Sequence, residues 1–370
     1  MAQQHINLGT PPNGADGDTN RTAWGKAEAN FNELFSRPIA VGKNRLINGN
    51  FDVWQRGTSL AANGGGSYRY LADRFATNAN GTTVAPSQQA FAPGQTAVPN
   101  EPAFFHRSVV ASNAGANFYC IMVQRIEDVR TLAGRTATLS FWAKADAAKP
   151  MSVDFEQNFG AGGSPSPLVN GIGSTKINLS TVWQFFQIPV TFPSIAGKTI
   201  GTTAASSFIN VVLWFDAGSN FNSRTNALGQ QSGTFDIAQI QLEAGAVATE
   251  FDQRLRGAEL ALCQRYYQKS YAYSVSLGTA TPAGAIAGRW HGSGAMTGAY
   301  FPVAMRTPPA VVIYSTNGSA GSATQFNGGS DVVSSLVADQ IGDGGFFRVN
   351  GVGGSAGEMY RYHYSADAEF

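Results

Sequence analysis

The sequence predicts a mostly β protein, and three observations lead to this prediction. Glycine is plentiful, with 43 residues among 370, and Asn, Ser and Thr are common between short apolar runs. Such a composition is typical of many turns that join many strands. Several runs, such as residues 139–144, alternate apolar and polar residues with the period of two that places one side of a strand in a core. The length of the chain fits two or three domains.

Charge and hydropathy narrow the classes of partner. The formal net charge is +1 and 13% of residues are charged, so no basic stripe could neutralise a run of phosphates, and nucleic acid is not expected as a partner. No apolar run approaches the ~18 residues that a bilayer-spanning helix needs, and residues 1–10 lack the pattern of a secretion signal. We therefore expect that the protein is made in the cytoplasm and does not insert into a membrane. The distant Cys120 and Cys263 are interpreted as two buried thiols.

Residues 1–42 are expected to form an arm followed by a short helix. Glycines and prolines interrupt residues 1–20, which predicts an extended arm. After Asn20 as a candidate N-cap, an apolar stripe follows at helical spacing, and Pro38 ends the helix. The stripe consists of Trp24, Ala27, Phe31 and Leu34. So short a helix is marginal alone, so its stripe must be buried by the rest of the chain or by copies of itself, and both alternatives stay open.

Three further regions complete the predicted architecture. Residues 43–252 contain short strand-like runs, among them 182–192, 208–215 and 235–242, whose lengths and boundaries fit a two-sheet β-sandwich. Residues 253–270 are predicted to be a helical connector, with an apolar face made by Leu255, Ala258, Leu262 and Tyr266. Residues 271–370 are predicted to be a small C-terminal β domain, because glycine is dense and prolines keep its strands short.

Four segments resemble parts of bacteriophage tail-fibre and receptor-binding proteins. The opening, INLGTPPNG at 6–14 with the stretch to residue 34, resembles the start of many phage tail and fibre proteins. NRLINGNFDVWQRG at 44–57, followed by ADRF at 72–75, is similar to the start of their jelly-roll modules. LSFWAKA at 139–145 resembles a strand of the carbohydrate-binding-module-like fold. QIQLEAG at 239–245, continuing to ELALCQRYY at 259–267, is similar to segments that close the module.

This resemblance implies a location and a set of partners. It implies that the sandwich is a jelly roll like that of carbohydrate-binding modules, and that the protein is a virion component of the tail, made in the host cytoplasm. It implies a homotrimer whose N-terminal end docks on phage tail or baseplate proteins and whose C-terminal end faces a host surface glycan or protein. The last 100 residues resemble distal fibre domains only around FPVAMR at 301–306 and Pro308-Pro309, so receptor identity does not follow.

Candidate catalytic groups are few. The four histidines, at 5, 106, 291 and 363, do not stand in the sequence context of a nucleophile elbow or a papain-like site. A glycosidase needs two carboxyl groups within ~10 Å. Asp154 and Glu156 could share one strand face, whereas Glu127 and Asp128 point to opposite sides or form a solvated turn. We expect no enzymatic activity and no catalytic residues.

Ions are weakly indicated. Asn50, Asp52 and Glu243 could offer hard oxygen ligands to calcium if the first and last strands of the module pair, but the same residues are typical of turn caps and strand ends. The latter interpretation is preferred. No spacing of His and Cys residues indicates zinc, and no other cofactor is expected.

The aromatic residues of the distal region are candidates for receptor binding. Sugar rings stack on flat apolar side chains, and shallow grooves suffice. Tyr360, Tyr362 and Tyr364 alternate, so they lie on one strand face, which could equally be a core face or a trimer seam, and this second interpretation is slightly favoured. The full set of candidates is Trp290, His291, Tyr300, Tyr314, Tyr360, Tyr362 and Tyr364.

The leading hypothesis is therefore a structural and adhesive tail-fibre subunit. Two alternatives remain open. One is a purely architectural collar, baseplate or tail-tip subunit that binds only virion proteins. The other is a fibre-borne polysaccharide depolymerase, which would need a groove with two carboxyl groups.

Overall fold

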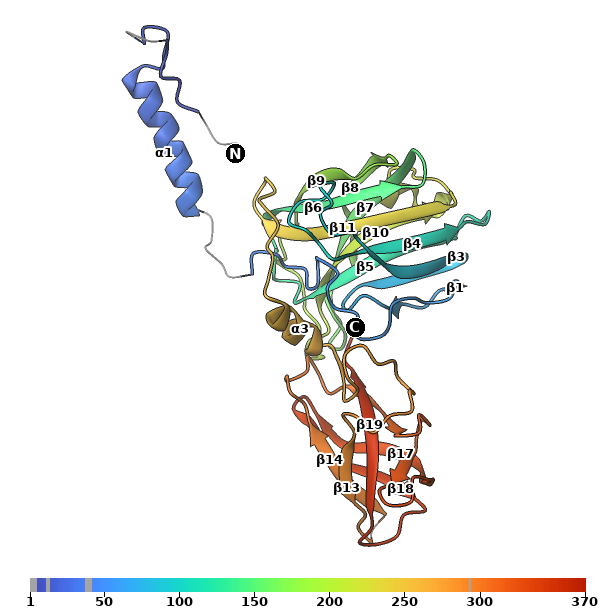
Figure 1. The fold of residues 1–370 in the computed structure, drawn as a ribbon. Coiled ribbons are helices and arrows are strands. Elements are labelled where there is room, and N and C mark those ends of the chain that lie inside the picture. Colours follow the sequence, from blue (N-terminus) through green and yellow to red (C-terminus); the bar gives the residue numbers. More distant parts are fainter. Residues whose placement is uncertain (1–4, 11–13, 37–41, 293) are drawn as a thin grey trace.

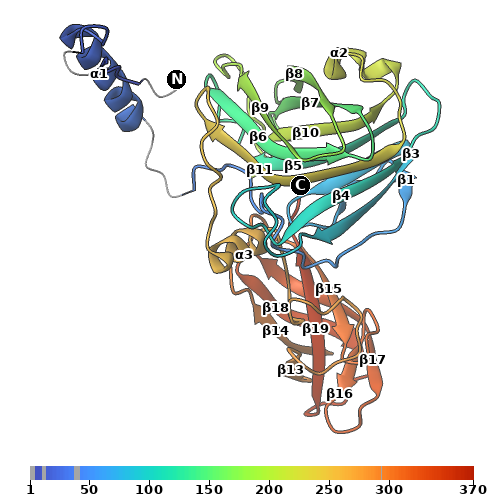
Figure 2. The same ribbon diagram turned by 45° about the horizontal axis from the view of Figure 1, so that its top comes forward.

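The protein consists of two β parts joined by a short helix (Figures 1 and 2). The computed structural model describes residues 5–10, 14–36, 42–292 and 294–370, with the side chains of 31–36 outside the described part. Helices and the 3₁₀ turn span Asn20–Ser36 (α1), Ser219–Phe221 (η1), Asn222–Thr225 (α2) and Arg256–Gln264 (α3). Strands of the first part are Asn63–Gly65 (β1), Arg69–Tyr70 (β2), Ala76–Ala90 (β3), Phe104–Ala111 (β4), Tyr119–Glu127 (β5), Thr136–Ala145 (β6), Lys149–Asn158 (β7), Val169–Leu179 (β8), Gln184–Thr191 (β9), Phe208–Ala217 (β10) and Gly233–Ala244 (β11). Strands of the second part are Tyr267–Lys269 (β12), Ile286–Arg289 (β13), Ala295–Tyr300 (β14), Ala310–Ser315 (β15), Ala323–Gln325 (β16), Asp331–Gly342 (β17), Gly345–Val352 (β18) and Met359–Asp367 (β19).

The first part is a near-barrel in which one long strand belongs to two sheet halves. The strand order is β8-β7-β10-β5-β3-β4-β11-β6-β9, and all pairs are antiparallel. Residues 76–81 of β3 pair with β5, while residues 83–90 pair with β4. Gly81 stands where the register shifts, at φ +70°, and a Cβ there would meet the Phe118 ring at 2.2 Å. Glycine is therefore required at this bend.

The core lies between the two sheet halves. The β7 half consists of β8, β7, β10, β5 and the start of β3. The β6 half consists of the rest of β3, β4, β11, β6 and β9. Leu139, Phe141 and Ala143 of β6 are fully buried and enter this core. The partly exposed Trp142 and Lys144 point the other way. The alternation predicted for residues 139–144 is therefore confirmed, and it results from packing one face of the strand against the opposite sheet half.

The second part is built around its last strand. The order is β12-β19-β16-β17-β18-β14, and β13 and β15 also pair with β19. Tyr360, Tyr362 and Tyr364 alternate along β19 and all point into the core, where they meet Trp290 and Phe346. β12 already belongs to this sheet, so the sheet begins inside the stretch that was assigned to the connector.

Helix α3 buries a different face from the one predicted. Leu255 precedes the helix and is 84% exposed, and Leu262 is also exposed. Within the helix the buried residues are Glu259 and Cys263, and of the four residues predicted for the apolar face Tyr266, which follows the helix, is buried. Glu259 tolerates burial because it accepts hydrogen bonds from the backbone N–H of Asn48 and from the guanidinium of Arg254. A pattern based on apolar residues could not identify this polar contact.

Three of the sequence motifs, at 44–57, 72–75 and 259–267, meet at the junction of the two β parts. Asn48 adopts φ 61°, and its amide group donates to the carbonyls of Val53 and Asp73 and accepts from the N–H of Val53, at 2.8 to 3.0 Å. Gln55 donates both to the Asp73 carboxylate and to the carbonyl of Tyr267, the first residue of the second sheet. These polar side chains replace the backbone pairing that regular strands would have provided.

Two arginines are buried at the same junction. Arg74 pairs with the carboxylate of Glu369, and its guanidinium lies 3.3 Å from the centre of the Tyr266 ring. Arg56 lies 3.1 Å from Asp367 and 3.5 Å from Glu369. Burial raises the pKa of Glu369, whereas the two arginines lower it. Arg56 and Arg74 of the first part thus hold the last residues of the second part, and this pair of buried arginines is called the charged socket.

Residues 5–10 and 14–19 lie against one another, whereas an extended arm was predicted. Asp18 accepts hydrogen bonds from the N–H of Asn7 and from Lys26, at 2.8 and 2.6 Å, and its own N–H donates to the carbonyl of Asn7. Thr19, rather than Asn20, caps α1 by accepting from the N–H of Thr22. No helix in the described part of the chain is both long and apolar enough to cross a membrane. Cys120 and Cys263 are buried and free.

A first prediction concerns the charged socket. Replacing Glu369 by Gln leaves the buried Arg74 without a carboxylate, so the free energy of unfolding should fall by about 3 to 5 kcal/mol in denaturant titrations. Glu127→Gln is the matched control, since Glu127 pairs with Arg265 at a partly exposed position and should cost about 1 kcal/mol or less. Equal losses in the two variants would contradict the central role of the socket.

A second prediction concerns pH. His106 is buried beside Phe51 and Trp54, and burial lowers its pKa to about 3. Because the unfolded chain takes up a proton near pH ~6.5 and the folded chain does not, stability should be lost as pH falls through this range. His106→Gln should remove up to about 1.4 kcal/mol of this loss per pH unit, measured by unfolding at pH 7 and below. Parallel pH profiles for both proteins would refute the assignment.

Candidate functional site

The outward face of the β7 half carries a group of aromatic and polar side chains. β7 contributes Asp154 and Glu156, β10 contributes Asn210 and Trp214, and β5 contributes Tyr119. The antiparallel register sets Asn210 opposite Glu156. Phe155, Val211 and Leu213, which alternate with them on the same strands, face the core, so the period of two fixes which side chains point outward.

The aromatic rings of this face contact one another. Tyr119 lies 6.1 Å from Trp214 and 5.3 Å from Phe221, and Trp214 lies 5.2 Å from Phe221, measured between ring centroids. Phe221 comes from the η1–α2 segment after β10, and Tyr68 comes from the turn between β1 and β2. Tyr68 is 39% exposed, and Tyr119 and Phe221 are half-buried. Tyr119 meets the other two rings edge to face, and together the three rings form a rigid apolar group.

A polar network lies beside the rings. The Arg224 guanidinium binds Asp154 at 2.8 Å and Glu156 at 2.7 Å, and it lies 4.9 Å from the centre of the Trp214 ring. Asp154 also accepts from the indole N–H of Trp214 at 2.7 Å, and Glu156 accepts from the amide of Asn210 at 2.7 Å. Arg224, Asp154 and Glu156 are therefore each held by two or more partners, which fixes their orientation.

One polar atom of this network has no partner. The carbonyl oxygen Oδ1 of Asn210 is buried and accepts no hydrogen bond from any described residue. A buried acceptor without a donor is costly, which makes it a natural position for the hydroxyl of a bound molecule. The face is hollowed by a pocket of about 140 Å³, lined by Tyr68, Tyr119, Ile121, Glu156, Asn210, Val212, Trp214, Phe221 and Arg224.

The electrostatics of the network suit binding better than proton transfer. Burial raises the pKa of Asp154, and the hydrogen bonds from Arg224 and Trp214 lower it. All four oxygens of Asp154 and Glu156 accept from neighbouring groups: Trp214, Arg224, Gly171 and Asn210. A general acid or base must reach the substrate directly. Both carboxylates are instead engaged in holding Arg224 and Asn210 in place.

The other candidate catalytic pair is separated by its contacts. Both oxygens of Glu127 bind Arg265, at 2.8 and 2.9 Å, whereas Asp128 turns away at φ 65° and accepts from the N–H of Arg130. The two carboxylates therefore serve different parts of the fold.

The structure corrects four of the receptor-binding candidates. Trp290, Tyr360, Tyr362 and Tyr364 are at most 4% exposed and form the core of the second part. Two of the hydroxyl groups find partners inside the protein: that of Tyr362 donates to the carbonyl of Thr297, and that of Tyr360 accepts from a backbone N–H. These four side chains cannot touch a receptor while the domain is folded.

The other three candidates lie on the surface but apart from one another in the sheet. Tyr300, at the end of β14, is 79% exposed, and its ring lies 5.4 Å from that of Phe347. His291 is exposed in the turn before β14. Tyr314 is half-buried on β15 and packs against Tyr271 at 6.1 Å.

The attachment and calcium candidates are placed as follows. Trp24 is 74% exposed and Ala27 is half-buried, while the side chains of Phe31 and Leu34 lie outside the described part of the chain. Asn50 donates to Asp52 at 2.9 Å. Glu243 accepts from Thr249 and Gln241. Among the described residues no three His, Cys, Asp or Glu side chains are placed to hold a metal ion.

Most of this face was not predicted from the sequence. Asp154 and Glu156 were expected to share one side of a strand, and they do. Asn210 and Trp214 also alternate along their strand, which was a usable signal. Tyr119, Phe221 and Arg224 are brought to the site by long-range strand pairing and a short helical turn, which no local pattern indicates.

Comparison with known proteins gives distant structural similarities alone. No protein-family model and no curated protein sequence matches the chain. A family 4 carbohydrate-binding module is 17% identical, with a TM-score of 0.29, covering 54% of this chain and 98% of the module. The family 11 carbohydrate-binding module from Clostridium thermocellum, in complex with a mixed-linked β-1,3-1,4 tetrasaccharide, is 12% identical, with a TM-score of 0.29, covering 52% and 97%.

A bacteriophage protein is also among the similar structures. The enzymatically active domain of tailspike protein 4 from bacteriophage CBA120 is 12% identical, with a TM-score of 0.30, covering 56% of this chain and 22% of that chain. The chain thus has distant structural similarity to carbohydrate-binding-module β-sandwiches and to a phage tailspike domain.

Proposed function

We propose that this protein is a structural and adhesive subunit of a bacteriophage tail, which holds host-surface glycan on the outward face of its β7 half. The observation that carries the glycan-binding part is the aromatic and polar face described above. It sets Tyr119 and Tyr68 beside a locked Arg224, Glu156 and Asn210. Aromatic carbon packs on the apolar side of a sugar ring, while fixed polar groups bond its hydroxyls.

The low net charge of this partly exposed network makes a sugar a better ligand than a charged metabolite. Arg224 is already neutralised by Asp154 and Glu156, so it offers oriented N–H donors with little net charge. The free Oδ1 of Asn210 offers an acceptor close to these donors. A neutral molecule with several hydroxyl groups satisfies donors and acceptors together without introducing an unpaired charge.

The virion part of the proposal is supported by the sequence. Four segments in the same order resemble phage tail and fibre proteins. We place the attachment to tail or baseplate proteins in residues 1–42, assign the protein to the tail of the virion, and expect a homotrimer. The exposed Trp24 supports assembly, because a second copy or a docking protein would remove its ring from water. No enzymatic activity is proposed.

A second contact surface is favoured by one observation. Tyr300 and Phe347 form an exposed aromatic pair on the second part of the protein, 79% and 48% exposed. This pair replaces the buried tyrosines as the distal candidate for contact with a host surface, and it can be tested beside the sheet face.

The glycan-binding proposal predicts a specific loss of affinity. Labelled full-length protein should bind a subset of bacterial surface polysaccharides on a glycan array. Tyr68→Ala and Tyr119→Ala should weaken that binding by about tenfold or more, because each removes a ring from the stacking surface. Phe185→Ala, a 42% exposed aromatic on the outward face of the β6 half, is the matched control and should bind like the wild type.

Tyr300→Ala separates the two surfaces. If this variant loses binding while Tyr68→Ala and Tyr119→Ala keep it, the receptor contact lies on the second part and the sheet-face proposal is wrong. Release of reducing ends from any bound polysaccharide would contradict the non-enzymatic assignment.

The assembly proposal predicts a mass. Light scattering of the full-length protein should give three times the mass of one chain, and Trp24→Ser should shift it toward the monomer because it removes the aromatic ring from the seam. Leu255→Ser, at an equally exposed apolar residue beside α3, should leave the mass unchanged. A monomeric wild-type protein would contradict the trimer.

A further inference from the structure

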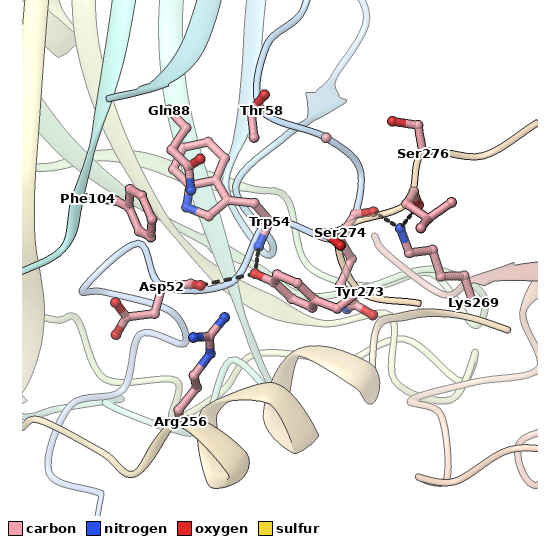
Figure 3. Close-up of a pocket in the computed structure, with 13 residues that line it drawn as sticks. Asp52, Trp54, Thr58, Gln88, Phe104, Arg256, Lys269, Tyr273, Ser274 and Ser276 are labelled. Carbon is pink, nitrogen blue, oxygen red and sulfur yellow. Dashed lines mark hydrogen bonds between the residues drawn. The ribbon is translucent and has the colours of Figure 1, made fainter. Parts of the chain in front are cut away.

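A second pocket lies where the two β parts meet. It has a volume of about 240 Å³. On one side it is lined by residues of the first part: Asp52, Trp54, Gln55, Gly57, Thr58, Gln88 and Phe104. The other side is Arg256 at the start of α3, Lys269 at the end of β12, and residues 273–276 (Figure 3). Because both parts contribute walls, this pocket exists only when the junction is assembled.

Its apolar walls are held in fixed positions. The hydroxyl of Tyr273 donates to the carbonyl of Asp52 at 3.0 Å and accepts from the N–H of Trp54, so the ring stands in the middle of the pocket (Figure 3). Phe104 and the edge of Trp54 line the same space. Lys269 is held by the carbonyls of Gln55 and Val275. Hydrogen bonds within the protein therefore fix the positions of Tyr273 and Lys269.

Several polar groups in the pocket are left without partners. Arg256 makes no hydrogen bond or ion pair with any described residue, although its guanidinium lies 5.5 Å from the centre of the Tyr273 ring. In Figure 3 it points between Asp52 and Tyr273. The Asp52 carboxylate accepts from Asn50 through Oδ2, and its Oδ1 has no partner in the described part of the chain. The side-chain amide of Gln88 is equally unpaired there.

We propose that this junction pocket binds a single sugar ring, as a site separate from the sheet face. The Asp52 carboxylate and the Arg256 guanidinium form an acceptor and a donor on one side of the pocket, which matches two neighbouring hydroxyl groups. Gln88 can both donate and accept at the opposite side. The rings of Tyr273 and Phe104 provide the apolar contact that a pyranose face needs.

Other small ligands fit these groups less well. An inorganic anion could pair with Arg256, but it would meet the Asp52 carboxylate on the same side and would leave the rings of Tyr273 and Phe104 without an apolar contact. A metal ion would be repelled by Arg256 and Lys269, and those two cations bracket the pocket. A purely apolar ligand would leave Asp52, Arg256 and Gln88 desolvated and unpaired. A neutral polyhydroxylated ring avoids all three costs.

Saturation-transfer NMR on the full-length protein tests this inference. The probes are the methyl glycosides of glucose, galactose, mannose and N-acetylglucosamine. At least one should receive magnetisation, and Arg256→Met and Gln88→Leu should each raise its dissociation constant by about tenfold or more, because each removes hydrogen bonds to hydroxyl groups. The bound glycoside should also raise the melting temperature of the wild type, because it joins the two parts.

Two controls assign any signal to the junction. Arg289→Met removes another exposed arginine of the second part and should leave binding unchanged. Tyr68→Ala should also leave glycoside binding to the junction pocket unchanged. A wrong proposal for the sheet face and a wrong proposal for the junction pocket therefore give different results. Absence of transfer to all four glycosides, or wild-type affinity in both Arg256→Met and Gln88→Leu, would overturn the proposal. Arg256 makes no hydrogen bond within the described chain, so its replacement should not affect folding.

Discussion

The burial of Arg56 and Arg74 is the constraint on which the arrangement of the two β parts depends. A guanidinium removed from water must find carboxylates, and here the partner common to both arginines is Glu369, which follows the last strand of the second part. The two β parts are consequently joined by more than α3 and the chain that continues from it. The same closure brings Tyr273 and Arg256 against residues 52–54 and so creates the junction pocket.

Three of the sequence motifs acquire a structural meaning at this junction. Asn48, Gln55 and Asp73 bind one another and the first strand of the second sheet. The motifs at 44–57, 72–75 and 259–267 therefore specify how two β parts are fixed together. They do not supply the aromatic and polar face of the β7 half, whose residues lie elsewhere in the sequence. The recognisable motifs and the proposed binding face are thus different parts of the molecule.

Local patterns were sufficient to predict several strands: the runs 139–144, 182–192, 208–215 and 235–242 correspond to β6, β9, β10 and β11. The alternation at Leu139, Phe141 and Ala143 identified β6 and its buried face, because a period of two has one solution against a core. The same rule placed the tyrosines of β19 on one face. It could not decide whether that face was core or surface, since the answer depends on the strands that cover it.

Long-range contacts set the limit of what could be predicted. Arg74 and Glu369 are 295 residues apart, and Arg224 and Asp154 are 70 apart. Helix α3 buries Glu259 because a distant backbone N–H needs an acceptor, which reverses the face expected from its apolar residues. For the same reason only part of the sheet-face site could be predicted. Asp154 and Glu156 lie on one strand, whereas their partners are contributed by β10, which pairs with it, and by the turn that follows β10.

The central claim is that a glycan lies on the outward face of the β7 half. A crystal structure with a bound oligosaccharide, chosen as the strongest binder from a glycan array, tests it most directly. We expect a sugar ring packed on Tyr119 and Tyr68, with a hydroxyl donating to Oδ1 of Asn210. An oligosaccharide found instead on Tyr300 and Phe347, with the β7 face empty, would contradict it.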